Sequence, residues 1–104
     1  MKPRTFVRPE AQNDIREAAR WYEDREAGLG VRFLSEVRTS LQRIADHPLM
    51  FPVIEEGVRR ALLHRFPYSL YFVNERDALA VIAVLHQHRR PSAWRSRREA
   101  RGGC

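Results

Sequence analysis

The sequence predicts one small α+β domain, in which an α-helical hairpin packs on a small antiparallel sheet. In the first half of the chain, apolar residues recur every three to four positions, as they do in amphipathic helices. In the second half, short β-prone segments alternate with turn residues. The chain has 104 residues, which is enough for one compact core.

The first half is expected to form a short strand and then the helical hairpin. Residues 5–8 are β-prone, and Pro9 suits the first turn of a helix that ends before Gly28. Gly28 and Gly30 make a tight connection, because glycine accepts positive φ, and this turns the second helix back against the first. The buried stripe of the second helix is expected at Leu34, Val37, Leu41 and Ile44. Trp21, Tyr22 and Phe33 are interpreted as core residues.

The second half is expected to form three strands, at about 58–64, 68–74 and 79–86. Their short connections favour an antiparallel meander, whereas residues 49–57 are expected to form a loop. The last strand is apolar at nearly every position, so both of its faces should be covered. The N-terminal strand must also pair, most simply beside this last strand. The predicted order is β-α-α-β-β-β.

Composition excludes several classes of protein. No apolar run approaches the roughly 20 residues of a membrane span, and the first residues lack the apolar core of a signal peptide. We therefore expect a cytoplasmic protein without a membrane partner. Cys104 is the single cysteine, which excludes an intramolecular disulfide and a cysteine-based zinc site.

The positive charge is concentrated at the C-terminus. The net charge is +6, and residues 88–104 hold six arginines against Glu99 alone. Such a field attracts nucleic acid or an acidic protein segment. Residues 95–104 have almost no apolar surface and are interpreted as a flexible basic tail, so their removal is expected to leave the fold intact.

Motifs along the chain combine in one specific order and spacing. They are Asp14-Ile15, Ala18 and Trp21-Tyr22; Gly28-Leu29-Gly30, Phe33-Leu34 and Val37; His47-Pro48 and Phe51-Pro52; Val58-Arg59-Arg60, Leu63, Phe66-Pro67-Tyr68 and Leu70-Tyr71-Phe72; and Val84-Leu85-His86, Arg89-Arg90-Pro91 and Trp94. Together they resemble the RelE/ParE toxin superfamily of type II toxin–antitoxin systems, and we interpret residues 1–94 as the toxin domain.

The resemblance implies growth inhibition, neutralisation by a cognate antitoxin in a hetero-oligomer, and no cofactor. RelE-like members cut messenger RNA in the ribosome, whereas ParE-like members poison DNA gyrase. RelE-like nucleases use a middle-strand arginine and a C-terminal tyrosine, and these positions correspond to Ser69 and Trp94. Serine cannot balance the charge of a phosphate, and an indole N–H is no useful acid or base. The two departures favour a ParE-like toxin that binds gyrase or a related target without catalysis.

Two surfaces are assigned on this hypothesis. The target-binding surface comprises His88, Arg89, Arg90 and Trp94, although Trp94 is alternatively expected to fold back and cap the sheet. The carboxylates of the antitoxin are expected to meet Arg59 and Arg60, whose alternative role is to protect an edge strand by charge.

Two other functions stay open. A metal-independent ribonuclease would use His86 or His88 as acid or base, with Arg65 and Arg89 near the phosphate. A toxin-derived module that only binds the antitoxin would need no such chemistry. We expect no metal site, because His64, His86 and His88 lack a carboxylate or cysteine to complete a zinc shell.

Overall fold

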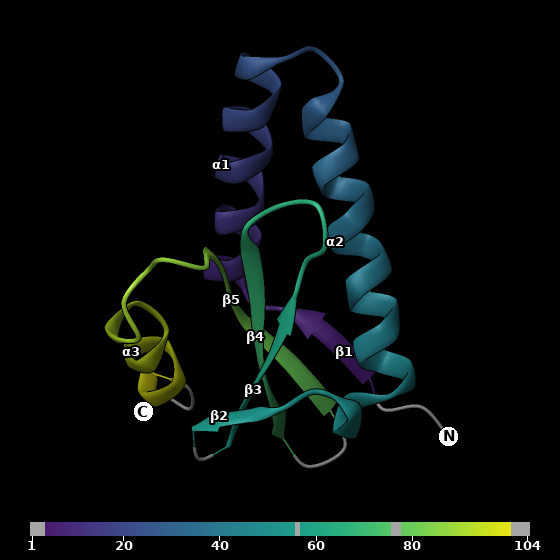
Figure 1. Cartoon of the computed structure of the whole chain (residues 1–104). Coiled ribbons are helices and arrows are strands. Elements are labelled where there is room, and N and C mark those ends of the chain that lie inside the picture. Colours follow the sequence, from purple (N-terminus) through teal and green to yellow (C-terminus); the bar gives the residue numbers. More distant parts are fainter. Residues whose placement is uncertain (1–3, 56, 76–77, 101–104) are drawn as a thin grey trace.

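A computed structural model describes residues 4–55, 57–75 and 78–100 of the protein (Figure 1). The elements are β1 (Arg4–Val7), α1 (Pro9–Arg25), α2 (Leu29–Asp46), the 3₁₀ turn η1 (Pro48–Met50), β2 (Val53–Glu55), β3 (Val58–Leu62), β4 (Tyr68–Glu75), β5 (Ala78–His86) and α3 (Ser92–Ala100). None of the helices in these ranges is both long and apolar enough to cross a membrane. The α+β class and the helical hairpin are confirmed.

The five strands form one mixed sheet in the order β1-β5-β4-β3-β2. The meander β3-β4-β5 is antiparallel, as its short turns predict. β1 does lie beside β5, but it runs parallel to it, so the expectation of an entirely antiparallel sheet was wrong. Short turns fix the relative direction of neighbouring strands, whereas β1 and β5 are separated by most of the chain. β2 is a short edge strand in the segment expected to be a loop.

The helical hairpin covers one face of the sheet (Figure 1). α2 buries Phe33, Val37 and Ile44 there, whereas Leu34, which was expected in the buried stripe, is exposed. The apolar positions of α2 span more than one column of side chains, so periodicity alone did not fix which column faces the sheet. Trp21 is 50% exposed and is not a core residue.

Gly28 and Gly30 have different roles in the connection between the helices. Gly28 has a φ of 90°, which favours glycine, and it precedes the first residue of α2. Gly30 lies inside α2, where a Cβ atom would be only 2.7 Å from the backbone oxygen of Ala19 on α1. The backbone N–H groups of both glycines donate to Glu23, each at 2.9 Å. The start of α2, directly after the predicted tight turn, is therefore also a place where the two helices approach closely.

α3 packs against the other face of the sheet, where Tyr71, Ile82 and Leu85 are buried. Trp94 is only 4% exposed, and its ring is stacked on Tyr71 with 5.3 Å between centroids. Both faces of β5 are therefore covered, as its continuous apolar sequence predicts. Of the two expectations for Trp94, the structure matches the one in which it caps the sheet.

The boundary expected between the toxin domain and the basic tail, at Arg95, falls inside α3. The part of the expected tail that the structure describes is therefore helical. Its arginines pair with carboxylates of other elements: Arg95 and Arg98 with Glu55 of β2, and Arg97 with Asp14 of α1. These carboxylates are distant in the sequence, which is why the tail looked unpaired. Residues 101–104, including Cys104, lie outside the described residues.

Candidate functional site

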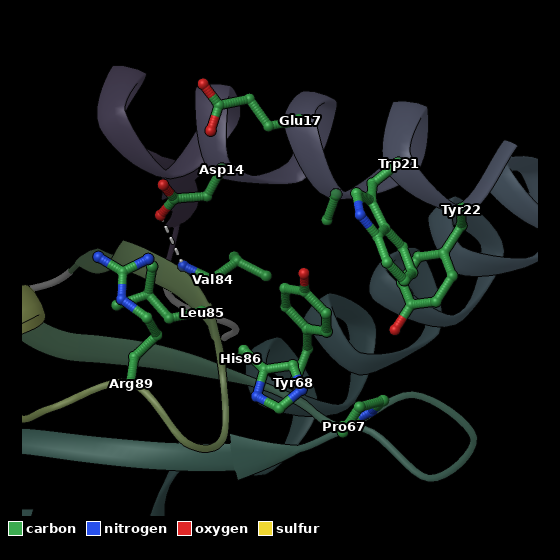
Figure 2. A pocket seen from close by; sticks show the side chains of 11 residues that line it. Asp14, Glu17, Trp21, Tyr22, Pro67, Tyr68, Val84, Leu85, His86 and Arg89 are labelled. Carbon is green, nitrogen blue, oxygen red and sulfur yellow. Dashed lines mark hydrogen bonds between the residues drawn. The ribbon is translucent and has the colours of Figure 1, made fainter. Parts of the chain in front are cut away.

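A cleft of about 530 Å³ lies between α1 and the ends of β4 and β5 that meet at Tyr68 and His86 (Figure 2). Its lining combines an apolar wall with titratable groups on both sides. The lining residues are Asp14, Glu17, Ala18, Trp21, Tyr22, Pro67, Tyr68, Val84, Leu85, His86 and Arg89. The hairpin supplies the carboxylates and two aromatic rings, the end of β5 supplies the histidine, and the turn after β5 supplies the arginine. We call this space the α1–β5 cleft.

Aromatic rings form one wall of the α1–β5 cleft. Tyr22 lies 6.0 Å from Tyr68 between ring centroids and packs on Phe33 and Phe66 at 5.5 and 4.8 Å. Burial is the main cause that raises the pKa of both phenols, and the Tyr68 phenol also raises the pKa of Tyr22. Both tyrosines therefore stay protonated near neutral pH and can donate hydrogen bonds, but they do not act as bases.

His86 and His88 stack on each other at the end of β5, with 5.1 Å between ring centroids. The backbone N–H of His88 donates to Nδ1 of His86 at 3.1 Å, and the His86 ring also meets Tyr68 edge-on at 5.4 Å. Nδ1 of His86 is thus occupied as an acceptor, which leaves Nε2 for any contact with a ligand. The last residue of β5 and the histidine of the turn that follows it therefore lie together.

The residues assigned to a ribonuclease are only partly assembled. His86 and Arg89 line the α1–β5 cleft, and His88 stacks on His86. Arg65 instead lines a second groove, on the α2 side of Pro67. The cleft also contains Asp14 and Glu17, whose carboxylates repel a phosphate. Within the ranges that the structure describes, no group of three or more potential metal ligands occurs.

Asp14 lies at the edge of the cleft and is held by two elements. Its carboxylate accepts the backbone N–H of Val84 at 3.0 Å and binds the Arg97 guanidinium through two contacts, at 2.5 and 3.1 Å. The hydrogen bond to Asp14 is the main cause that raises the pKa of Arg97. Sequence reasoning missed this pair, because Asp14 was noted only within a motif of the first helix and Arg97 only as part of the basic tail.

Ser69 and Trp94 both lie away from the α1–β5 cleft. Ser69 is fully buried on β4, and its hydroxyl has no hydrogen-bond partner among the described residues. Trp94 is held against Tyr71 by α3, so its indole has little surface to offer a target in this conformation. Of the four residues assigned to target binding, the structure leaves His88, Arg89 and Arg90 exposed, on the turn between β5 and α3.

Arg59 and Arg60, assigned to antitoxin binding, are both half-buried on β3. The Arg59 guanidinium donates to the backbone oxygen of Phe51 at 2.6 Å, which ties β3 to the segment before β2. Nε of Arg60 is buried and has no partner in the described part of the chain. Arg59 thus has a structural contact, whereas Arg60 keeps hydrogen-bonding capacity that is not used.

A solved structure of the chromosomal ParDE TA system from P. aeruginosa has the same fold, with a TM-score of 0.74 and 13% sequence identity. The alignment covers 82% of this chain and 96% of the other chain. No curated protein sequence matches. Residues 6–91 match the family described as "ParE toxin of type II toxin-antitoxin system, parDE". This match spans most of the chain, which therefore belongs to the ParE toxin family.

Proposed function

We propose that this ParE-family toxin acts in the cytoplasm by binding DNA gyrase or a related target, with no catalytic step of its own. Cleavage of RNA without a metal needs a base, an acid and cations that hold the phosphate. The burial of Ser69 is the observation that carries the proposal. Ser69 occupies the middle-strand position at which RelE-like nucleases have an arginine. A serine hydroxyl is uncharged and cannot supply the cation that this arginine would provide.

The exposed turn between β5 and α3 is the proposed target-binding surface. It presents His88, Arg89 and Arg90, and it is held in place because the backbone N–H of Arg89 donates to the oxygen of His86 at 2.9 Å. Trp94 lies in the first turn of α3, the helix that follows, and is proposed to support this surface from beneath. Arginine side chains on a rigid turn suit the recognition of carboxylates or phosphates.

Membership of the family implies an antitoxin partner. We propose that this antitoxin neutralises the toxin in a hetero-oligomer and that Arg60 binds one of its carboxylates. The half-buried Arg60 side chain supports this assignment, because it has no hydrogen-bond or ion-pair partner among the described residues and a guanidinium gains from pairing with a carboxylate. We propose that Arg59 binds the antitoxin beside Arg60, with one of its hydrogen-bond donors already bonded to the backbone oxygen of Phe51.

A ribonuclease is the second candidate, because His86, His88 and Arg89 do lie together at the mouth of the α1–β5 cleft. The test is to induce the protein without its antitoxin in a bacterial host. Under the proposal, growth stops, cells filament and the DNA-damage response is induced. The purified protein is then expected to inhibit gyrase in a supercoiling assay without cleaving RNA.

The double variant His86→Ala/His88→Ala separates the two candidates. Under the proposal it still arrests growth, since the histidines perform no proton transfer and the loss of His88 only weakens a target-binding surface that keeps Arg89 and Arg90. Loss of toxicity in a double variant that keeps the melting temperature of the wild type, together with rapid collapse of translation in the wild type, would favour the ribonuclease. If the wild type does not arrest growth at all, the chain is a module that only binds the antitoxin.

A further inference from the structure

Two basic segments lie side by side at one end of the sheet (Figure 1). The first is the loop between β3 and β4, residues 63–67, and the second is the turn between β5 and α3, residues 87–91. The backbone N–H of Gln87 in the turn donates to the oxygen of Pro67 in the loop at 2.8 Å, which joins the two segments. We call their surface the basic end of the sheet. Its basic side chains are all exposed, and they are His64, Arg65, His88, Arg89 and Arg90.

The backbone of both segments is fixed by hydrogen bonds. In the loop, Oε2 of Glu36, on α2, accepts the backbone N–H of Arg65 at 3.0 Å. In the turn, the backbone N–H groups of His88 and Arg89 both donate to His86, at 3.1 Å to its Nδ1 and at 2.9 Å to its backbone oxygen. The arginines of the basic end are therefore mounted on an ordered backbone before a ligand arrives, which lowers the entropy lost on binding.

The three arginines of the basic end are free to bind anions. In the part of the chain that the structure describes, the guanidinium groups of Arg65, Arg89 and Arg90 have no hydrogen-bond or ion-pair partner. Arg65 and Arg89 line grooves on opposite sides of Pro67, so the guanidinium groups are spread over the surface and do not converge on one point. This arrangement suits a row of anions better than a single phosphate or carboxylate.

Carboxylates border the basic end but leave its charge positive. Those that line the two neighbouring grooves are Asp14, Glu17 and Glu36. Asp14 is paired with Arg97, and the charge of Glu36 is offset by Arg32, which lines the same groove. Among these carboxylates, Glu17 is left to oppose the three exposed guanidinium groups of the basic end. The field at this end therefore attracts a polyanion.

The large apolar side chains at the basic end decide between a protein and a nucleic acid as the ligand. Leu63 and Phe66 of the loop are buried, and so are Leu85 and Trp94 on either side of the turn. Protein interfaces have an apolar core, whereas interfaces with nucleic acid are more polar and more positively charged. The burial of Phe66 also removes a ring on which an unpaired base could stack, which favours a duplex over a single strand.

We propose that the basic end of the sheet binds the phosphate backbone of duplex DNA without reading its sequence. Arg65, Arg89 and Arg90 each pair with a phosphate, and the DNA lies across the loop and the turn. The inference rests on the proposed function in one respect, because it takes this DNA to be the segment that gyrase holds beside the toxin. The contact with DNA is a property of the toxin itself and is measured without gyrase.

The test uses the purified full chain and a fluorescently labelled DNA duplex of random sequence. Fluorescence anisotropy measures its Kd at several salt concentrations, because each neutralised phosphate releases counterions. Three phosphate contacts predict that the logarithm of the affinity falls with the logarithm of the salt concentration with a slope of about −2.7. The affinity should thus decrease roughly fortyfold between about 50 and about 200 mM salt.

The triple variant Arg65→Ala/Arg89→Ala/Arg90→Ala should lose most of this salt dependence, since each missing contact reduces the slope by about 0.9. Each single variant should show about one third of that effect. All three side chains are exposed and unpaired in the described part of the chain, so the variants should keep the melting temperature of the wild type.

The matched control is Arg16→Ala/Arg20→Ala/Arg38→Ala. It removes the same charge from exposed positions on the helical hairpin that line neither of the grooves beside Pro67. The slope of its salt dependence should stay near that of the wild type, because these arginines lie outside the proposed contact.

Three results would overturn the inference. The first is that the wild type shows no salt-dependent binding of the duplex. The second is an equal reduction of the slope in the control variant, which would make the attraction a general effect of net charge. The third is that single-stranded RNA of the same length binds more tightly than the duplex and loses affinity in the triple variant, which would make the basic end a site for RNA.

The supercoiling assay separates this inference from the proposed function. Inhibition of gyrase by a toxin that does not bind DNA would overturn the inference and leave the proposed function in place. Binding of DNA by a toxin that does not inhibit gyrase would instead overturn the proposed function, and the contact with DNA would stand.

Discussion

Asp14 joins three elements of the protein through one carboxylate. It lies on α1, accepts the Val84 N–H of β5 and binds Arg97 of α3. β1 ends at Val7, opposite Val81, so in the described part of the chain no strand lies beyond that point on the side of β5 that faces away from β4. Arg97 also donates to the Ile82 oxygen at 3.2 Å. Asp14 and Arg97 thus provide hydrogen-bond partners for the Val84 N–H and the Ile82 oxygen, which a longer β1 would otherwise bond.

Replacing Arg97 by alanine is expected to lower the free energy of unfolding by roughly 1–3 kcal/mol, because it leaves the Asp14 carboxylate without its cation. The side chain of Asp14 is only 9% exposed, so water replaces the lost contact poorly. Urea denaturation measures the change. The control is Arg95→Ala, whose side chain is 52% exposed and whose removal should cost about 0.5 kcal/mol or less. Equal effects of the two substitutions would show that the Arg97–Asp14 pair contributes no more to the free energy of unfolding than an exposed ion pair does.

Ser69→Ala is expected to leave stability unchanged or to raise it by up to about 1 kcal/mol, because the buried hydroxyl has no partner among the described residues. Thermal and urea denaturation of the two proteins measure the difference. Growth arrest should persist in the variant, since the proposal gives this hydroxyl no role. A clear loss of stability would mean that the hydroxyl is hydrogen-bonded after all.

At the scale of elements, the contact between α1 and α2 depends on Gly30. A methyl group at this position would lie 2.7 Å from the Ala19 backbone oxygen, which cannot move without distorting α1. We expect Gly30→Ala to lower the free energy of unfolding by about 1–3 kcal/mol, measured by urea denaturation. Gly28→Ala tests a different cause of instability. Nothing lies within 4 Å of the added methyl group, so only the positive φ of this residue is unfavourable for alanine. No loss of stability in Gly30→Ala would show that the helices separate easily.

The contact between α3 and β2 is expected to depend on pH through Glu55. The hydrogen bond from Arg95 is the main cause that lowers the pKa of this carboxyl group, against a smaller opposing effect of burial. A group whose pKa is lower in the folded state stabilises the fold above its unfolded pKa, roughly 4.3 for glutamate. This stabilisation is lost as the pH falls through the lowered folded pKa.

The fluorescence of Trp94, in a Trp21→Phe background, reports this transition. We expect the Trp94 signal to change as the pH falls through the lowered pKa of Glu55, when Arg95 and Arg98 lose the charge of this carboxylate. In Glu55→Gln the part of the change due to this carboxyl group should be missing. Identical pH profiles for the two proteins would mean that Glu55 does not hold α3 in place.

At the scale of the whole molecule, α3 completes the fold. A chain that stops after Trp94 keeps the buried indole but loses the residues that pair with Asp14 and Glu55. The sequence alone suggested that this truncation is harmless, whereas the structure leads us to expect a lower melting temperature, by several degrees per kcal/mol lost. Scanning calorimetry of the full and shortened chains measures it. An unchanged melting temperature would support the original view of a dispensable tail.

The sequence predicted the helical hairpin, the antiparallel meander and the position of β1 next to β5. These features depend on the local periodicity of apolar residues and on short turns, and both can be read directly along the chain. The short separation along the chain also keeps His86, the last residue of β5, close to His88 in the turn that follows it. The continuous apolar character of β5 also indicated that something covers the second face of the sheet.

The tertiary structure alone decided the parallel direction of β1, the side of α2 that is buried, and the separation of Arg65 from His86 and Arg89. It also decided that Arg97 binds a carboxylate 83 positions away. The physical reason is the same in each case. These contacts join residues that are distant in the chain. No local sequence pattern records which distant side chain, strand or helix face will meet a given residue in the folded protein.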